Sequence, residues 1–274
     1  MGQFLPVKIL EEEFATRLFK EGEVYMRSIH EFGSWGVFDA SKELKNNYRA
    51  DIHSGVCEVF ATPEDSEFFR ATPDPPKSYM KHLCYVDNSD IQYFNIYSLI
   101  CLDYKNGFHT IDPQMRQFGN KAIVFTDFNT FLGRLNNALI DRYHTITFLC
   151  NKVEWYDFDQ TRKVDPLFWK YKAQEYQNEL RIAFCQLQEG NGPLRAIKKD
   201  YEAVTIKIGS IQDIACMVET DQLISGDFDF NNSKLIWPSD DTNNHQSIYD
   251  RRIALTKRQM GIYSPKEVKP MFSI

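Results

Sequence analysis

Residues 171–184 read YKAQEYQNELRIAF, and their pattern changes from polar to apolar at a single carboxylate, Glu179. The residues after it are mainly apolar and include Leu180, Ile182, Ala183 and Phe184. This change predicts a loop or helix end that enters a half-buried strand, with an acid at the junction. Two interpretations of that acid are open at this point, namely a solvated helix end and a catalytic glutamate.

The composition is that of an ordinary globular protein. The chain has 274 residues, 43% of them hydrophobic and 26% charged, and its formal net charge is −6. This length suits one large domain or two small ones, and the negative charge excludes a global positive field for nucleic acid. Residues 1–14 lack the pattern of a secretory signal, and no apolar run is long enough to span a membrane. We therefore expect a cytoplasmic protein that does not enter a membrane.

Hydrophobic periodicity predicts strands and helices that are mixed without strict β-α-β alternation. Strands are expected in residues 6–10, 23–29, 91–104, 121–127, 178–187 and 203–209, with a strand or hairpin in 144–158. Helices are expected in residues 11–22, near 39–46, and in 128–143, 165–177 and 210–218, the first ending at Gly22 and the last capped by Ser210. This order indicates an α+β fold, with residues 1–274 forming a single domain around a split mixed β-sheet.

Several common chemistries find no support in the sequence. The chain contains no P-loop, dinucleotide fingerprint or nucleophile elbow, and neither its cysteines nor its histidines have the spacing of a metal site. The six cysteines are expected to be free thiols in a reducing compartment. Two pairs of acids, Asp157 with Asp159 and Asp227 with Asp229, are compatible with solvated turns or with a metal-dependent nuclease.

A set of polar residues on separate segments suits the transfer of a group from NAD. Cleavage of the bond between nicotinamide and ribose builds oxocarbenium character on the ribose, which one nearby carboxylate can stabilise. An arginine can hold the pyrophosphate through its fork of donors, and an aromatic ring can stack on the nicotinamide. This chemistry needs no metal. The candidate residues are Tyr25, Ser28, Tyr48, Arg49, Asp51, Gln177 and Glu179.

Three stretches carry a resemblance to a known family. They are LFKEGEVYMRSIHEFG (18–33), YRADIHSG (48–55) and KAQEYQNELRI (172–182). Together they resemble the ADP-ribosyltransferase-like toxins of bacterial phage-defence and toxin–antitoxin systems. The resemblance implies an ADP-ribosyltransferase-like fold and an NAD-dependent transferase that moves ADP-ribose to a macromolecule. A nucleic-acid base, in RNA or single-stranded DNA, is the implied acceptor, and an antitoxin protein is the implied partner.

The resemblance also implies individual roles. Arg49 matches the arginine that holds NAD, Glu179 matches the catalytic acid, and Gln177 precedes it in a Q-x-E arrangement. The first strand, residues 6–10, lacks the His or Arg that many members of the family carry there. Tyr25 and Ser28 could take its place, together with Arg27. The residues expected to contact NAD are thus Arg49, Tyr25, Ser28, Tyr48 and Asp51.

Other interpretations of the same residues are open. Glu179 and Arg181 could form an exposed pair on one face of a strand, and Arg49 and Asp51 could form a surface pair. The whole chain could be a non-catalytic defence module that binds a partner protein. Two basic clusters, residues 195–200 and 249–259, could be solvated faces or a local track for nucleic-acid phosphates.

Overall fold

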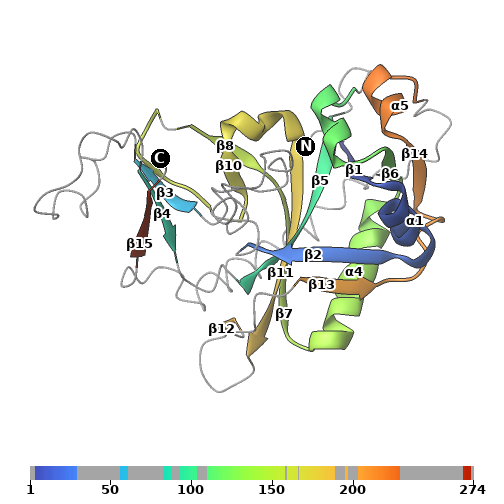
Figure 1. Ribbon diagram of the computed structural model, residues 1–274. Helices are drawn as coiled ribbons and strands as arrows, with labels where there is room; N and C mark the ends of the chain where they lie inside the picture. The colour runs from blue at the N-terminus through green and yellow to red at the C-terminus, as the bar shows by residue number, and fades with distance from the viewer. Residues whose placement is uncertain are drawn as a thin grey trace, which may run out of the picture.

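The computed structural model has an α+β architecture, which confirms the predicted fold class (Figure 1). It describes residues 4–29, 56–60, 83–87, 93–103, 110–157, 159–165, 167–188, 195–196, 203–228 and 268–272. Several sequence-based predictions lie outside these ranges. They are the cofactor-binding residues Tyr48, Arg49 and Asp51, the helix expected near 39–46 and the basic cluster 249–259.

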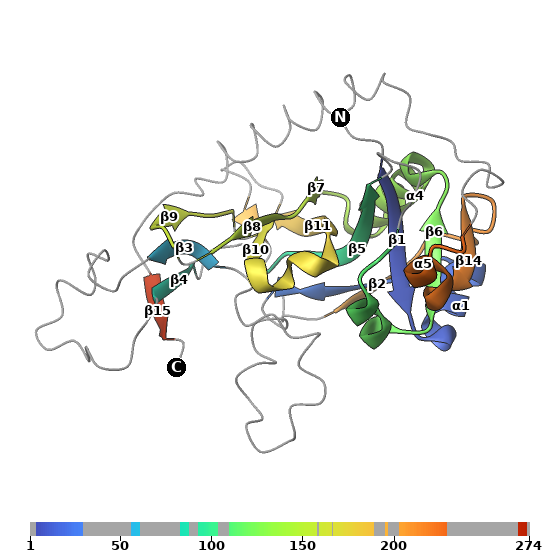
Figure 2. The same ribbon diagram turned by 90° about the horizontal axis from the view of Figure 1, so that it is seen from above.

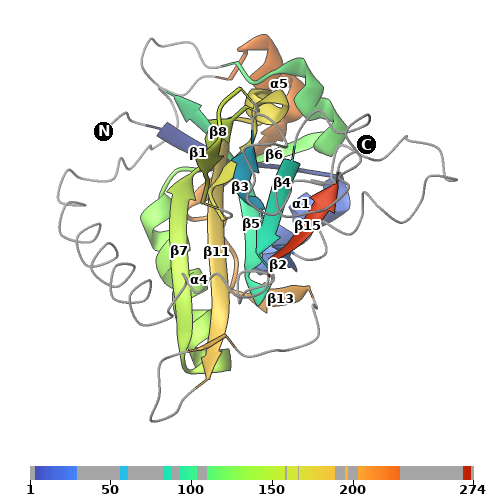
Figure 3. The same ribbon diagram turned by 90° about the vertical axis from the view of Figure 1, so that its left-hand side faces the viewer.

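The largest element of the fold is a nine-stranded sheet with the central order β12-β11-β5-β1-β6-β14. Its strands are β1 (Phe4–Leu10), β2 (Glu23–Ser28), β5 (Asn95–Asp103), β6 (Lys121–Phe125), β7 (Ile146–Lys152), β11 (Glu179–Gln188), β12 (Arg195–Ala196), β13 (Val204–Lys207) and β14 (Ala215–Glu219). Strand β7 adds to β11, and β2 joins β5 to β13. Figure 3 shows β7 and β11 running side by side.

Every pairing described in this sheet is antiparallel, so the expectation of a mixed sheet is wrong for it. Parallel neighbours require a crossover connection, usually a helix. Helix α1 (Glu12–Glu21) connects β1 to β2, and α4 (Phe128–Tyr143) connects β6 to β7. Neither of these helices joins two strands that pair with each other in the described ladders, so neither creates a parallel pair.

Two smaller sheets accompany the large one. A four-stranded sheet has the order β15-β4-β3-β9, from β15 (Val268–Phe272), β4 (Leu83–Asp87), β3 (Val56–Phe60) and β9 (Arg162–Lys163). A parallel pair is formed by β8 (Glu154–Tyr156) and β10 (Trp169–Tyr171). Figure 2 shows the four-stranded sheet at one end of the molecule, with β14 and α5 (Thr220–Ser225) at the other. The pair β8 and β10 lies between these two ends (Figure 2), and the N–H of Val153, just before β8, donates to the carbonyl of Glu179 in β11 at 2.9 Å.

The large sheet is split along one edge of β5. Residues 100–103 of β5 pair with β1, and residues 95–96 pair with β2. Residues 97–99, which lie between these two segments, pair only with β11 among the described strands. Strand β1 continues to β6, whereas β2 continues to β13 (Figure 1). The predicted split is therefore present, and it opens at the middle of β5.

One face of the sheet packs against α1 and α4. The helical spacing of Phe131, Leu135 and Leu139 predicted an apolar stripe, and all three side chains are completely buried against the sheet. Their neighbours include Leu180 and Ile182 of β11. Because buried apolar side chains from both helices and six strands meet here, this cluster is the main hydrophobic core of the described part.

The opposite face carries two apolar clusters with polar residues between them. One cluster includes Val7, Ile100 and Leu223, and the other includes Ile96 and Ala183. Alternate residues of a strand point to the same face, so Ser98 projects between Ile96 and Ile100. Glu179 and Arg181 project from β11 on this face before Ala183. The two clusters thus flank a polar centre.

Helix α1 ends where the sequence predicted, at Gly22. This residue has the left-handed backbone angle φ of 65°, and its N–H donates to the carbonyl of Leu18 at 2.9 Å. Its own carbonyl accepts a bond from the N–H of Ile208 at 3.1 Å. A Cβ atom at Gly22 would lie only 1.9 Å from the backbone oxygen of Gly209. The tight approach of α1 to the end of β13 therefore depends on a glycine here.

Two predicted helices are wrong. Residues 165–177 form β10 and then a 3-10 helix, η5 (Lys172–Gln177), because pairing with β8 imposes an extended conformation on 169–171. Residues 210–218 form a turn followed by β14, because Ala215 and its successors pair with β6. In both segments, tertiary pairing overrides the local pattern. Residues 144–158 contain β7 and β8, which pair with β11 and β10 and do not form a hairpin with each other.

None of the helices in the described ranges has the length and apolar character needed to cross a bilayer.

Candidate functional site

The acid of the opening stretch stands at the first position of β11. The preceding 3-10 helix ends at Asn178, whose left-handed conformation with φ of 38° turns the chain into the strand. Asparagine tolerates this conformation better than most residues. The carbonyl of Asn178 accepts a bond from the N–H of Cys101 at 2.7 Å, which ties the junction to β5. The predicted position of Glu179, at the start of a late strand, is thus confirmed.

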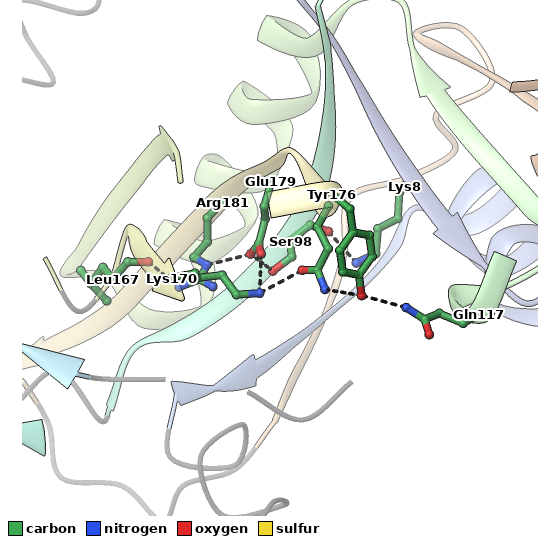
Figure 4. Close-up of polar contacts among 9 residues, drawn as sticks. Lys8, Ser98, Gln117, Leu167, Lys170, Tyr176, Glu179 and Arg181 are labelled. Atoms are coloured by element: carbon green, nitrogen blue, oxygen red, sulfur yellow. Dashed lines mark hydrogen bonds and ion pairs between the residues drawn. The ribbon is translucent and has the colours of Figure 1, made fainter. Parts of the chain in front are cut away.

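Glu179 is held by three side chains from three strands (Figure 4). The hydroxyl of Ser98 and Nε of Arg181 donate to its Oε1 at 2.6 and 2.8 Å. Nζ of Lys170 donates to its Oε2 at 2.9 Å. Only 3% of Glu179 and 4% of Arg181 is exposed, and Lys170 is buried as well. One carboxylate and two cations therefore form a buried network with a formal charge of +1.

Further bonds fix both cations of this network. Nζ of Lys170 also donates to Oε1 of Gln177 at 2.9 Å, and Arg181 donates from its Nη1 to the carbonyl of Leu167 at 2.6 Å. Nε2 of Gln177 in turn donates to the hydroxyl of Tyr176 at 3.3 Å. Both acceptors lie in the segment that precedes β11, with Leu167 just before β10 and Gln177 at the end of η5. Because each cation has two fixed acceptors, the orientation of the carboxylate is also fixed.

The network keeps Glu179 ionised. Burial by itself raises the pKa of a carboxyl group, because it disfavours the charged form. At Glu179 this effect is outweighed by the charges of Arg181 and Lys170 and by hydrogen bonds from Arg181 and Ser98. The result is a pKa far below the ordinary value of 4.5. At neutral pH the site therefore contains a carboxylate anion inside the protein.

The lowered pKa predicts a specific dependence of stability on pH. A carboxyl group whose pKa is lower in the folded state stabilises the fold above its unfolded pKa, and this contribution is lost as the pH falls below that value. The difference in unfolding free energy between the wild type and Glu179→Gln should therefore shrink as the pH falls below about 4.3. Urea unfolding at a series of pH values measures it. A difference that stays constant from neutral to strongly acidic pH would contradict the prediction.

A cavity of about 590 Å³ occupies the split of the sheet and includes Glu179 in its wall. Residues 97–99 of β5, which pair only with β11 among the described strands, form its base, and its other walls include β1, one face of α1 and one face of β2. Five cationic and three acidic residues line it, a formal surplus of two positive charges. They are Lys8, Arg17, Arg27, Lys170 and Arg181, with Glu11, Glu23 and Glu179. A cavity of this volume and charge suits a small anionic ligand.

The structure places some of the predicted site residues at this cavity. Gln177 is buried and lines it beside Glu179, and Tyr25 lines it from β2. Ser28 is buried at the end of β2, opposite Asn95, and does not line the cavity. The interpretation of Glu179 and Arg181 as an exposed pair is wrong, because the two side chains share a face of β11 but are buried.

Three residues of the site were not found from the sequence. Ser98 and Lys170 bond to Glu179 directly. Lys8 of β1 lines the cavity, and its Nζ donates to the carbonyl of Ser98 at 2.7 Å, at the point where none of the described strands pairs with β5 on that side. A lysine within the otherwise apolar stretch LPVKIL (5–10) was a usable signal, since burial of a charge requires a partner.

Four of the six cysteines, Cys101, Cys150, Cys185 and Cys216, have described side chains, and these four are free thiols. Burial raises the pKa of Cys150 to about 12, so this thiol is not a nucleophile. Within the described ranges, which contain Asp157, Asp159 and Asp227 but not Asp229, no group of three or more His, Cys, Asp or Glu side chains is placed to hold a metal ion.

Comparison with known proteins identifies no relative of this chain. No protein-family model, curated protein or solved structure matches the chain.

Proposed function

We propose that the chain is an NAD-dependent ADP-ribosyltransferase whose reaction takes place at Glu179, in the split of the sheet. On this proposal it acts in the cytoplasm as a toxin in bacterial anti-phage defence and is restrained by an antitoxin protein, as the family resemblance implies. The observation that carries the proposal is a buried, ionised carboxylate in the wall of a cavity with a surplus of positive charge. An ionised carboxylate is what an oxocarbenium-like ribose requires.

The reaction can be written for these groups. The bond between C1 of the ribose and the nicotinamide nitrogen breaks, and its electron pair leaves with nicotinamide. The positive charge that develops on the ribose is stabilised by the carboxylate of Glu179, and an acceptor nitrogen or oxygen then attacks C1 and loses its proton. This reaction is a displacement without a change in oxidation state, so NAD is a substrate and no metal is required.

The hydrogen bonds of Glu179 leave room for a ligand. An ionised carboxylate has about four acceptor positions, two on each oxygen. Within the described part of the chain, Oε1 accepts from Ser98 and Arg181, whereas Oε2 accepts only from Lys170. One position on Oε2 therefore remains for a donor such as a ribose hydroxyl. A hydroxyl bound there would bring the sugar next to the negative charge.

The cations of the cavity suit the other part of NAD. Lys8 and Arg27 approach the split from β1 and β2, on opposite sides of the base formed by residues 97–99. The pyrophosphate of a dinucleotide carries two negative charges, which match the formal surplus of two positive charges in the lining. Electrostatic complementarity of this kind favours an anionic dinucleotide over a neutral ligand.

Arg49 is proposed to anchor the pyrophosphate, on the basis of its match to the family motif. Replacement by alanine should weaken NAD binding by about 1.5–3 kcal/mol, the usual scale for a charge-assisted hydrogen bond. Replacement by lysine should restore only part of this loss, because lysine lacks the planar fork of donors. Calorimetric titration with NAD measures both variants. Unchanged affinity in both would identify Arg49 as a surface residue.

The reaction itself is tested by incubating the protein with labelled NAD and bacterial extract. The products are then digested separately with protease, RNase and DNase. Transfer of label to material that RNase or DNase degrades is the expected result, and it should persist in the presence of a chelator. Label that only protease releases would reassign the acceptor to protein. Degradation of nucleic acid that a chelator abolishes would favour a metal-dependent nuclease, and no transfer at all would favour a binding module.

A further inference from the structure

The mouth of the cavity carries two exposed aromatic side chains. The described residues include three large hydrophobic side chains that are strongly exposed, namely Phe14, Tyr25 and Ile140, which are 46%, 47% and 39% exposed. Phe14 and Tyr25 both line the cavity, whereas Ile140 lies on α4 and does not. Exposed aromatic rings at the mouth of a cavity are a feature of binding sites, because a ligand that covers them removes apolar area from water.

Each of the two rings is paired with an arginine. The guanidinium carbon of Arg17 lies 4.9 Å from the centroid of Phe14, and that of Arg27 lies 5.5 Å from the centroid of Tyr25. Both distances are within the range of cation–π attraction. Arg17 also forms an ion pair with Glu23 of β2 at 3.2 Å, which connects α1 to β2. The two ring–arginine pairs therefore stand at defined places on adjoining walls.

The spacing of residues along α1 and β2 explains why Phe14 and Tyr25 face the same cavity. Phe14 and Leu18, four residues apart, share one face of α1, and Glu11 precedes the helix at the matching three-residue interval. Glu23, Tyr25 and Arg27 alternate along β2 and share its outer face. All six residues line the cavity. The rings are thus presented by a helix and a strand rather than by a long loop.

We propose that Phe14 and Tyr25 form a stacking platform for a base of single-stranded nucleic acid. Bases stack on aromatic side chains with little regard to sequence, and arginines beside the stack attract the neighbouring phosphates. A cationic peptide side chain fits less well, because the cavity lining as a whole has a formal surplus of two positive charges. The platform is a binding site whether or not the protein uses NAD as a substrate, and its role in presenting the acceptor base rests on the proposed function. Tyr25 then contacts the acceptor instead of NAD, consistent with its exposure.

The test is a direct binding measurement made without NAD. Fluorescence anisotropy with labelled oligouridylate and oligothymidylate, at one fixed salt concentration, gives the dissociation constant of each variant. Phe14→Ala and Tyr25→Ala should each weaken binding about 5- to 140-fold, the scale for loss of one base–aromatic stack. Phe14→Leu should also weaken it, because leucine keeps apolar area but has no ring. Tyr25→Phe keeps the ring and should bind as the wild type does.

The matched control is Ile140→Ala, which removes an exposed hydrophobic side chain away from the cavity and should leave oligonucleotide binding unchanged. Equal affinity of the wild type, Phe14→Ala and Tyr25→Ala would overturn the platform. So would absence of oligonucleotide binding in the wild type, or tighter binding of an oligoarginine peptide that depends on Phe14. If oligonucleotide binding depends on both rings but calorimetry detects no binding of NAD, the platform stands and the proposed transferase function fails.

Discussion

Replacement of Glu179 by glutamine is expected to lower the rate of ADP-ribose transfer by about 10²- to 10⁴-fold, the usual contribution of one acid–base or electrostatic group. The same substitution should lower the free energy of unfolding by about 3–5 kcal/mol, because it leaves the buried cations Lys170 and Arg181 without their shared counter-ion. Initial rates with labelled NAD measure the first effect, and urea unfolding at neutral pH measures the second.

A second variant separates catalysis from folding. Glu179→Asp keeps the negative charge between Lys170 and Arg181 but withdraws the carboxylate by one methylene. Its stability should fall less than that of Glu179→Gln, whereas its transfer rate should still fall strongly, because the anion no longer reaches the ribose. If Glu179→Asp is as active as the wild type, or if both variants lose activity only in proportion to unfolded protein, Glu179 is a structural counter-ion and not a catalytic group.

Replacement of Gly22 by alanine is expected to destabilise the fold by about 2–5 kcal/mol. About 1–2 kcal/mol of this comes from placing a Cβ atom in the left-handed conformation. The remainder comes from the clash with the backbone oxygen of Gly209, which must move, at a cost comparable to overpacking a core. Because the end of α1 and the start of β2 move together, the cavity wall should shift and NAD binding should weaken. Thermal and urea unfolding measure the stability, and calorimetry measures the affinity.

Gly209 supplies the matched control. It also has a positive φ, of 79°, but no atom lies within 4 Å of the position that its Cβ would take. Gly209→Ala should therefore cost only the conformational part, about 1–2 kcal/mol. Equal destabilisation by the two substitutions would show that the contact between Gly22 and Gly209 is looser than the structure has it.

The sequence was a good guide where local pattern and tertiary environment agree. The strand expected at 121–127 and the helix expected at 128–143 have a clear period, and the structure has them as β6, residues 121–125, and α4, residues 128–143. The segments 165–177 and 210–218 were assigned the wrong structure. A short apolar run fits both the period of a helix and that of a strand, and pairing with strands that are distant in the sequence determines which one forms. The prediction of a mixed sheet was also wrong for the large sheet. The relative direction of paired strands depends on how they are connected, and local hydrophobicity carries no information about those connections.

The site could be predicted only in part, because most of its contacts join residues that are far apart in the sequence. The change of pattern at Glu179 is local, and it located the acid at the start of a strand. Its partners are not local. Ser98 lies 81 positions away, and Lys170 lies in a segment that was expected to be helical. The sequence pattern could show that Arg181 shares a face with Glu179, but not that both are buried.

The split along β5 also affects the thermodynamics of ligand binding. Its base is one strand, and the two diverging walls are held to that strand by ladders on either side of residues 97–99. The walls cannot close or open far without breaking those ladders, so a ligand meets a recess whose shape exists before it arrives. Little backbone entropy is then lost on association, and affinity follows from preorganisation rather than from the ordering of a disordered segment.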